Sequence, residues 1–85
     1  MKQKKVTVND IEYTLQNPGY RWYIKNTGIA SKGGGMDQEY LMDKYFETVV
    51  ANPKVSMEDF EKKDELGGFK AMLELISECE KFLTT

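Results

Sequence analysis

The chain has 85 residues, enough for one domain. A domain of this size buries only about 60% of the surface that its unfolded chain exposes, which leaves little room for a deep active site beside the core. Its 12 Lys and Arg against 14 Asp and Glu give a net charge of −2, so no general attraction to nucleic acids or anionic membranes is expected. The chain has no His, the commonest general base and metal ligand, and pairs no nucleophile with a base. A non-enzymatic protein without metal or cofactor is predicted.

The single cysteine, Cys79, cannot form an internal disulfide. The sequence has no signal peptide and no apolar run long enough to cross a bilayer. A reducing cytoplasm is therefore the predicted compartment. Cys79 lies on the apolar side of the last predicted helix, which favours a small core residue over a redox thiol.

The first predicted element is an antiparallel hairpin over about residues 4–16. Polar and apolar side chains alternate on both sides of Asn9-Asp10, and these residue types tolerate the positive φ angles of a two-residue turn. A register that pairs Val8 with Ile11 gathers the apolar side chains on one face. That face should pack on the helices that follow, because an isolated hairpin is marginal in water. Its members are Val6, Val8, Ile11 and Tyr13.

A short helix is predicted over about residues 18–27. Asn17 is suited to cap its start, and Pro18 fits the first helical position. One face of this helix is expected to pack on the rest of the domain, and it carries Tyr20, Tyr23 and Ile24. Trp22 falls outside this face.

The next segment, residues 29–36, is predicted to be a flexible loop. It contains three consecutive glycines, and Gly28 before it is the expected end of the helix. A phosphate-binding loop is disfavoured because no Lys-Ser or Lys-Thr pair follows the glycines.

A longer helix is predicted over about residues 37–51, with Asp37 as its cap. Pro53 ends it because proline disfavours helical geometry in the residue before it. Apolar side chains recur at three- and four-residue spacings and form a broad face. The face consists of Leu41, Met42, Tyr45, Phe46, Val49 and Val50. Ser56 and Asp59 resemble a capping box that opens a short helical turn.

The last helix is predicted over about residues 64–83. Gly67-Gly68 in its first turns should delay or bend the helix. Its apolar side is formed by Leu66, Phe69, Met72, Leu73, Ile76, Cys79 and Leu83. The fold class is therefore α+β, with an N-terminal hairpin followed by three main helices and a short helical turn. The middle and last helices carry more apolar side chains than the hairpin and one short helix can cover, so a homo-oligomer is predicted.

A nucleic-acid-binding or regulatory role is the leading alternative to a protein-binding role. Aromatic and basic side chains alternate along the first helix, as in single-strand binding sites. The residues concerned are Arg21, Trp22, Tyr23 and Lys25, together with the N-terminal Lys2, Lys4 and Lys5. Packing of the aromatic side chains within the domain is favoured over base stacking.

Two motifs resemble a known family. They are KVTVNDIEYTLQNPG at residues 5–19 and VVANPKVSMEDF at residues 49–60. Together with the order of the elements, they resemble the tail assembly chaperones of long-tailed, siphovirus-type phages and prophages of Gram-positive bacteria. The resemblance covers nearly the whole chain.

The resemblance implies a chaperone that binds the long helical tape measure protein in the host bacterial cytoplasm. It also implies that the protein helps recruit tail-tube subunits, that it is absent from the mature virion, and that this chain corresponds to the shorter product where a ribosomal frameshift makes a longer one. Client contacts are expected from partly exposed adaptable side chains. Trp22, Met36 and Met42 are the predicted contact residues.

Overall fold

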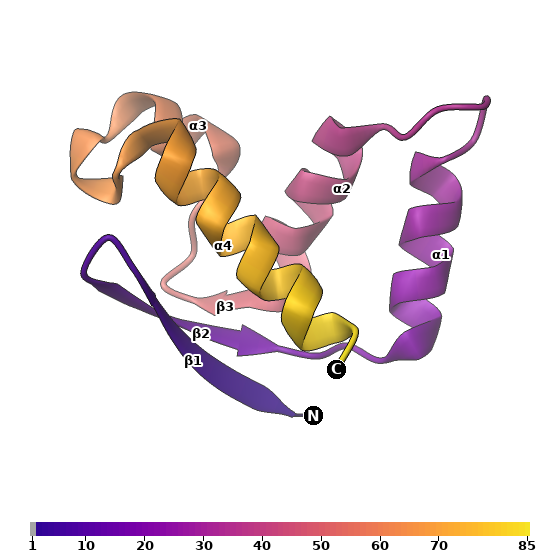
Figure 1. Ribbon diagram of the computed structural model, residues 1–85, viewed down its shortest axis with the longest axis horizontal. Helices are drawn as coiled ribbons and strands as arrows, with labels where there is room; N and C mark the ends of the chain where they lie inside the picture. Colours follow the sequence, from indigo (N-terminus) through magenta and orange to yellow (C-terminus); the bar gives the residue numbers. More distant parts are fainter. Residues whose placement is uncertain (1) are drawn as a thin grey trace.

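The computed structural model describes residues 2–85 and has an α+β fold, in which a small sheet packs against helices (Figure 1). The sheet has the strand order β1-β2-β3, and both neighbouring pairs are antiparallel. The strands are β1 (Gln3–Val8), β2 (Ile11–Gln16) and β3 (Val50–Asn52). The α-helices are α1 (Tyr20–Ala30), α2 (Gln38–Lys44), α3 (Met57–Lys62) and α4 (Gly68–Leu83). None of these helices is long and apolar enough to cross a membrane.

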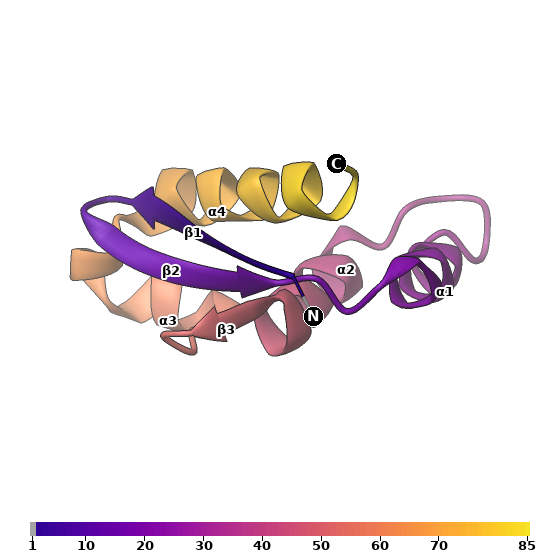
Figure 2. The same ribbon diagram turned by 90° about the horizontal axis from the view of Figure 1, so that it is seen from below.

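The predicted hairpin and its register are confirmed. Val8 pairs with Ile11, and Val6 pairs with Tyr13. Both turn residues have positive φ angles, 51° at Asn9 and 65° at Asp10, as a two-residue hairpin turn requires. The inward face packs beneath α4 (Figure 2) and includes Val6, Val8, Tyr13 and Leu15, all buried. β1 forms one edge of the sheet, and its outer side pairs with no strand of residues 2–85.

The predicted helix over residues 37–51 is wrong in its second half. The α-helical part ends at Lys44, a π-helical turn spans Tyr45–Val49, and the chain then enters β3. The wider π turn leaves the side chains of its first and last residues buried together in the core. Val50 then pairs with Leu15 of β2. The apolar side chains that fit a continuing helix are therefore shared between a widened turn and a third strand.

Two side chains satisfy carbonyl groups where the π turn ends. The Gln16 Nε2 donates to the Thr48 oxygen at 2.8 Å, and the Lys54 Nζ donates to the Glu47 oxygen at 2.7 Å. The last carbonyls of a helix have no partner within the helix, so such side-chain donors stabilise its end. Gln16 therefore ties β2 to the end of this turn.

The apolar face of the middle segment is covered by the chain itself. Tyr45, Phe46, Val49 and Val50 are all buried, and the Phe46 ring stacks on Phe60 of α3 with ring centroids 5.7 Å apart. The predicted capping box of α3 is confirmed: Asp59 N donates to Ser56 Oγ at 3.3 Å, and Ser56 N donates to Asp59 Oδ2 at 2.9 Å. This face therefore gives no reason for self-association.

The last helix is divided near its start, which corrects the predicted span of residues 64–83. A 3-10 turn occupies Asp64–Leu66, Gly67 has a φ of 99°, and α4 begins at Gly68. The tip of the hairpin packs at this point, where Asn9 Nδ2 donates a hydrogen bond to the backbone carbonyl oxygen of Glu65 at 3.0 Å. The core side of α4 carries Ala71, Met72, Leu75, Ile76, Cys79 and Leu83. Phe69 and Leu73, predicted on the buried face, are exposed.

Helix α1 lies to one side of the body, next to α2 (Figures 1 and 2). Its predicted packing face is wrong at two of its three positions: Tyr20 and Ile24 are 73% and 68% exposed, whereas Tyr23 packs against the core. The helix instead buries Asn26 and Ala30. It also continues through Gly28, the expected stop, to Ala30.

Contacts of Trp22 and Asn26 explain this orientation of α1. The Trp22 ring packs on Tyr45 with centroids 6.1 Å apart. Asn26 Nδ2 donates to the Trp22 oxygen at 2.8 Å, and the Tyr40 hydroxyl donates to Asn26 Oδ1 at 3.1 Å. A buried amide with partners on both atoms can occupy a helix interface at little cost. The predicted start of this helix, with Asn17 as its cap and Pro18 in its first position, is wrong: α1 begins at Tyr20 after Gly19, and Asn17 Oδ1 accepts a hydrogen bond from Gly19 N at 2.8 Å ahead of the helix.

Candidate functional site

Two of the three predicted contact residues line one crevice between α1, α2 and α4. Met36, from the loop before α2, is 50% exposed, and Met42 on α2 is half-buried. The crevice has a volume of about 220 Å³. It is lined by Tyr23, Thr27, Met36, Gln38, Leu41, Met42, Tyr45, Ile76 and Glu80.

The start of α2 positions the two methionines. Asp37 caps this helix, with its Oδ1 accepting from Tyr40 N at 3.0 Å, so Met36 immediately precedes the cap and Met42 lies in the second turn. Leu41, Tyr45 and Ile76 are buried and form the apolar base of the crevice. The site is therefore built on rigid helices and has one flexible side chain contributed by the loop.

Glu80 is the charged group among the residues that line this crevice. Burial raises the pKa of the Tyr45 hydroxyl above its ordinary value, and the nearby Glu80 carboxylate raises it further. Tyr45 is therefore a neutral hydrogen-bonding group at physiological pH. The crevice combines an apolar base, two adaptable methionines and one carboxylate.

The structure places Trp22 behind this crevice rather than in it. Trp22 is half-buried and packs on Tyr45, which itself lines the crevice. Trp22 therefore supports the base of the crevice from the side of α1. The exposed apolar side chains of α1 are Tyr20, Ile24 and Ile29, and periodicity placed the first two on the packing face. No signal in the sequence distinguished the two faces, because the true interface contains a polar residue, Asn26.

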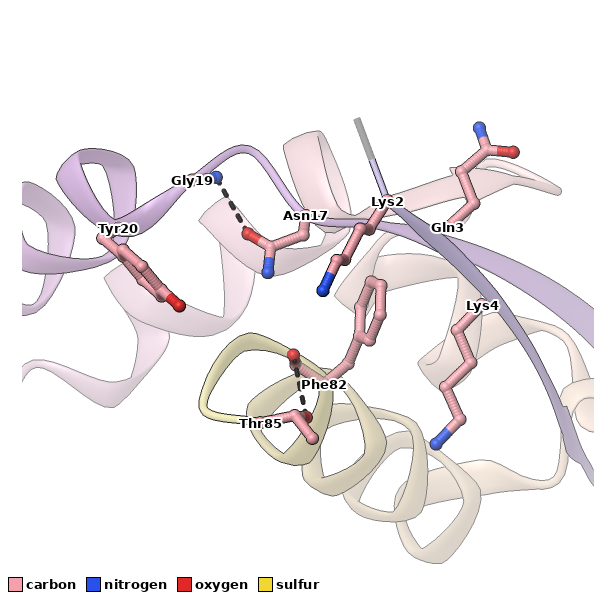
Figure 3. Close-up of a pocket in the computed structure, with 8 residues that line it drawn as sticks. All are labelled: Lys2, Gln3, Lys4, Asn17, Gly19, Tyr20, Phe82 and Thr85. Carbon is pink, nitrogen blue, oxygen red and sulfur yellow. Dashed lines mark hydrogen bonds between the residues drawn. The ribbon is translucent and has the colours of Figure 1, made fainter.

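A second and larger hollow, of about 640 Å³, lies between the start of β1, the β2–α1 link and the end of α4 (Figure 3). The side chains of Lys2 and Asn17 point into it above the Phe82 ring, and Tyr20 stands on the far side. Its lining consists of Lys2, Gln3, Lys4, Asn17, Gly19, Tyr20, Phe82 and Thr85. The charged side chains of this set are those of Lys2 and Lys4, and its aromatic side chains are those of Tyr20 and Phe82.

The side chains predicted for the nucleic-acid alternative do not form one platform. Lys2 and Lys4 line the second hollow, where their aromatic neighbours are Tyr20 and Phe82. Lys5 instead forms an ion pair with Glu12, with an Nζ–Oε1 distance of 3.7 Å. The other predicted members are distributed over α1: Arg21 and Lys25 are exposed, whereas Trp22 and Tyr23 pack against the core.

Cys79 is a core residue, as predicted. It is fully buried, and burial raises the pKa of its thiol to about 12. Such a thiol stays protonated and is a poor nucleophile at physiological pH. Within residues 2–85, no group of three or more Cys, Asp and Glu side chains could hold a metal ion.

Comparisons with models of protein families, with curated proteins and with solved structures gave no match to this chain. The role of the protein is therefore inferred from the geometry of the two hollows and from its sequence motifs. A small apolar crevice and an open basic hollow are both suited to binding side chains of another protein.

Proposed function

We propose that this protein is a tail assembly chaperone that binds an amphipathic helix of a phage tape measure protein and helps recruit tail-tube subunits. The observation that carries this proposal is the crevice between α1, α2 and α4, which contains Met36 and Met42. Methionine adapts its shape to different apolar partners and is common at surfaces that bind helices. The motif resemblance at residues 5–19 and 49–60 supplies the identity of the client.

The size of the crevice favours a protein side chain over a small-molecule ligand. Its volume of about 220 Å³ is below the range of about 300–1,000 Å³ that is usual for ligand pockets. A helix that docks in a groove inserts single apolar side chains at three- and four-residue spacings. The crevice would hold one such anchor, with the methionines adjusting around it.

The Glu80 carboxylate favours a client helix that carries a positive charge beside its apolar anchor. It lies at the same crevice as the apolar base formed by Leu41 and Ile76. A client helix with a Lys or Arg near its apolar anchor would place a cation beside this carboxylate. Charge complementarity of this kind contributes more to specificity than to affinity, so the main driving force is burial of apolar surface.

Co-expression with the tape measure protein from the same genome tests the proposal. The wild-type chain should keep that protein soluble, and capture should persist at high salt because apolar burial is weakly screened. Met36→Asp should weaken capture at least about tenfold, since it places a charge at the apolar opening. Ile29→Asp is the matched control, because Ile29 is a similarly exposed apolar residue that does not line the crevice. Thermal unfolding should show that both variants remain folded.

Trp22→Ala does not test client binding alone, although the sequence placed Trp22 among the contact residues. The substitution removes packing on Tyr45, so it should lower stability as well as weaken capture. The proposal would be wrong if the tape measure protein stayed insoluble with the wild-type chain. It would also be wrong if the Met36 and Ile29 variants captured the client equally well.

A further inference from the structure

Charge is distributed very unevenly along this chain. Residues 2–36 contain six Lys and Arg but two Asp and Glu, whereas residues 37–85 contain six Lys and Arg and twelve Asp and Glu. Two hollows, one near each end of α4, are lined by charged side chains of opposite sign. Lys2 and Lys4 lie near its end, and an acidic group that includes Glu61 and Asp64 lies near its start. A small protein with net charge −2 thus has one hollow lined by lysines and one lined by carboxylates.

The acidic end of α4 also presents an exposed aromatic side chain. Phe69 is 69% exposed and lines a hollow of about 400 Å³ together with Glu61 and Asp64. The adjacent carboxylates of Glu58 and Asp59 pair with Lys62 and Lys63. Among the ion pairs of residues 2–85, none includes Glu61 or Asp64. The Phe69 ring and the Glu61 and Asp64 carboxylates are therefore open to contact with a partner.

The basic end has the complementary features. The hollow over Phe82 is about 640 Å³ in volume, which is ample for an aromatic side chain (Figure 3). Lys2 and Lys4 line it and take part in no ion pair of the described part of the chain. Tyr20, on its far side, is 73% exposed. A ring that entered this hollow would meet aromatic partners and two ammonium groups near its rim.

We propose that copies of this chain associate head to tail, with Phe69 of one copy entering the hollow over Phe82 of the next. Glu61 and Asp64 of the first copy then approach Lys2 and Lys4 of the second. Aromatic pairing and burial supply affinity, and the opposite charges fix the orientation. Because the two surfaces differ, a pair of copies still has one free hollow and one free Phe69, and the assembly grows into a closed ring or an open filament.

A second copy fits the basic hollow better than a nucleic acid does. Among residues 2–85, two ammonium groups line the hollow, whereas affinity for a phosphate backbone grows with the number of phosphates neutralised. The chain as a whole is acidic, and a long polyanion would meet the carboxylates of residues 37–85. The acidic region of another copy supplies a small number of carboxylates beside an apolar group, which matches what the hollow offers. None of the residues in this contact lines the crevice of Met36 and Met42, so the inference stands independently of the client.

Sedimentation velocity on the full chain tests this assembly over a concentration series up to about 100 μM, which covers ordinary interface affinities. The wild-type chain should form species larger than a dimer at low salt and smaller species as salt increases. Phe69→Ala should raise the dissociation constant at least about tenfold. Ile24→Ala, which removes an equally exposed apolar side chain on α1, should leave assembly unchanged.

Charge reversal identifies the partner surface directly. The double variant Lys2→Glu/Lys4→Glu and the double variant Glu61→Lys/Asp64→Lys should each be monomeric, because each brings like charges together at the contact. A mixture of the two variants should assemble again, since every hollow then meets a region of opposite charge. Lys25→Glu/Lys32→Glu makes the same change in net charge away from the hollow and should assemble like the wild-type chain.

Three results would overturn the proposal. The first is a wild-type chain that stays monomeric at about 100 μM and low salt. The second is assembly that is unaffected by Phe69→Ala, or that fails to return when the charge-reversed variants are mixed. The third is a monomer that binds a fluorescent single-stranded oligonucleotide at low salt and loses it in Lys2→Glu/Lys4→Glu, which would assign the hollow to nucleic acid.

Discussion

Single glycines have contrasting roles in this chain. Gly67 has a φ of 99°, and a Cβ at this position would lie 2.7 Å from the Ala71 Cβ and 2.8 Å from the Asn9 Cγ. Gly28 lies within α1, and a Cβ there would meet no atom within 4 Å. Gly67 is therefore required where the hairpin tip meets the start of α4, whereas Gly28 only weakens a helix.

Alanine substitutions should have opposite effects at these two positions. Gly67→Ala should lower the free energy of unfolding by about 2 kcal/mol or more, because it adds left-handed strain to a clash with the hairpin tip. Gly28→Ala should raise it by about 0.5–1 kcal/mol, since alanine favours the helix and restricts the unfolded chain. Urea titrations of both variants give the comparison. Effects of the same sign would show that the hairpin tip does not pack on Gly67 as described.

At the level of elements, the contact between α1 and α2 depends on few side chains. The Asn26 amide accepts a hydrogen bond from Tyr40 of α2, and Trp22 packs on Tyr45 of the π turn that follows α2. The outward side of α1 carries the exposed Tyr20 and Ile24. Besides these two contacts, α1 buries Ala30 and packs Tyr23 on the core, whereas α4 buries six side chains, so α1 should open at a lower free energy than α4.

Native-state amide exchange should detect this dependence. Asn26→Ala should speed exchange in α1 by about five- to tenfold, which corresponds to the loss of about 1 kcal/mol, and leave exchange in α4 unchanged. Tyr40→Phe should have a smaller effect of the same kind. The double variant should lose little more than Asn26→Ala alone, because the two side chains share one hydrogen bond. Additive losses would mean that they act independently.

The hairpin was predictable because its determinants are local. The alternation of polar and apolar side chains on both sides of Asn9-Asp10 fixes which side chains share a face, and the turn residues fix the register. The third strand could not be predicted in the same way. Val49 and Val50 fit a continuing helical face, and only the contact with Leu15 of β2, far away in sequence, makes Val50 part of a strand. The packing face of α1 was mispredicted because Asn26, a polar residue, occupies the interface that hydrophobicity assigned to Ile24.

The candidate site was predictable in part for the same reason. Met36 and Met42 are near each other in sequence, so their position beside the glycine loop was evident and the structure does bring them together. Ile76 and Glu80 complete the crevice from α4, and no local pattern links them to the methionines. The basic hollow likewise joins Lys2 to Phe82, from opposite ends of the chain. Sites assembled from distant elements need the fold before they can be recognised.

At the scale of the whole molecule, the stability of the fold depends on pH through three buried groups that can lose a proton, the hydroxyls of Tyr13 and Tyr45 and the thiol of Cys79. Burial raises the pKa of Tyr13, whose buried hydroxyl has no hydrogen-bond partner among residues 2–85, and also the pKa of Tyr45. It raises the pKa of Cys79 from 9.0 to about 12. The unfolded chain loses these protons at their ordinary pKa values, whereas the folded chain retains them. The contribution of Cys79 to stability is therefore complete below pH 9 and is lost as the pH rises towards 12, and the contributions of the two tyrosines are likewise lost at alkaline pH.

Urea titrations between about pH 8 and about pH 11 should show a fall in the free energy of unfolding of a few kcal/mol, since each pKa unit is worth about 1.4 kcal/mol. Cys79→Ala should lower stability at neutral pH by leaving a small cavity, but its curve should fall less steeply with pH. Tyr13→Phe should be at least as stable as the wild-type chain at neutral pH, because it removes an unpaired buried hydroxyl. Parallel curves for the wild-type chain and the Cys79 variant would contradict the role of the thiol.

The open outer edge of β1 gives the N-terminal lysines a second role. An unpaired strand edge is a template on which further strands can add, and natural proteins discourage such aggregation by placing lysine along it. Lys4 and Lys5 lie within β1, and Lys2 immediately precedes it. Replacing them with neutral, β-branched residues would leave an edge on which strands of other molecules could pair and aggregate, whatever the hollow over Phe82 binds. Glutamate keeps a charge at the edge. The substitutions Lys2→Glu and Lys4→Glu therefore change the charge of the hollow while the edge strand still resists aggregation.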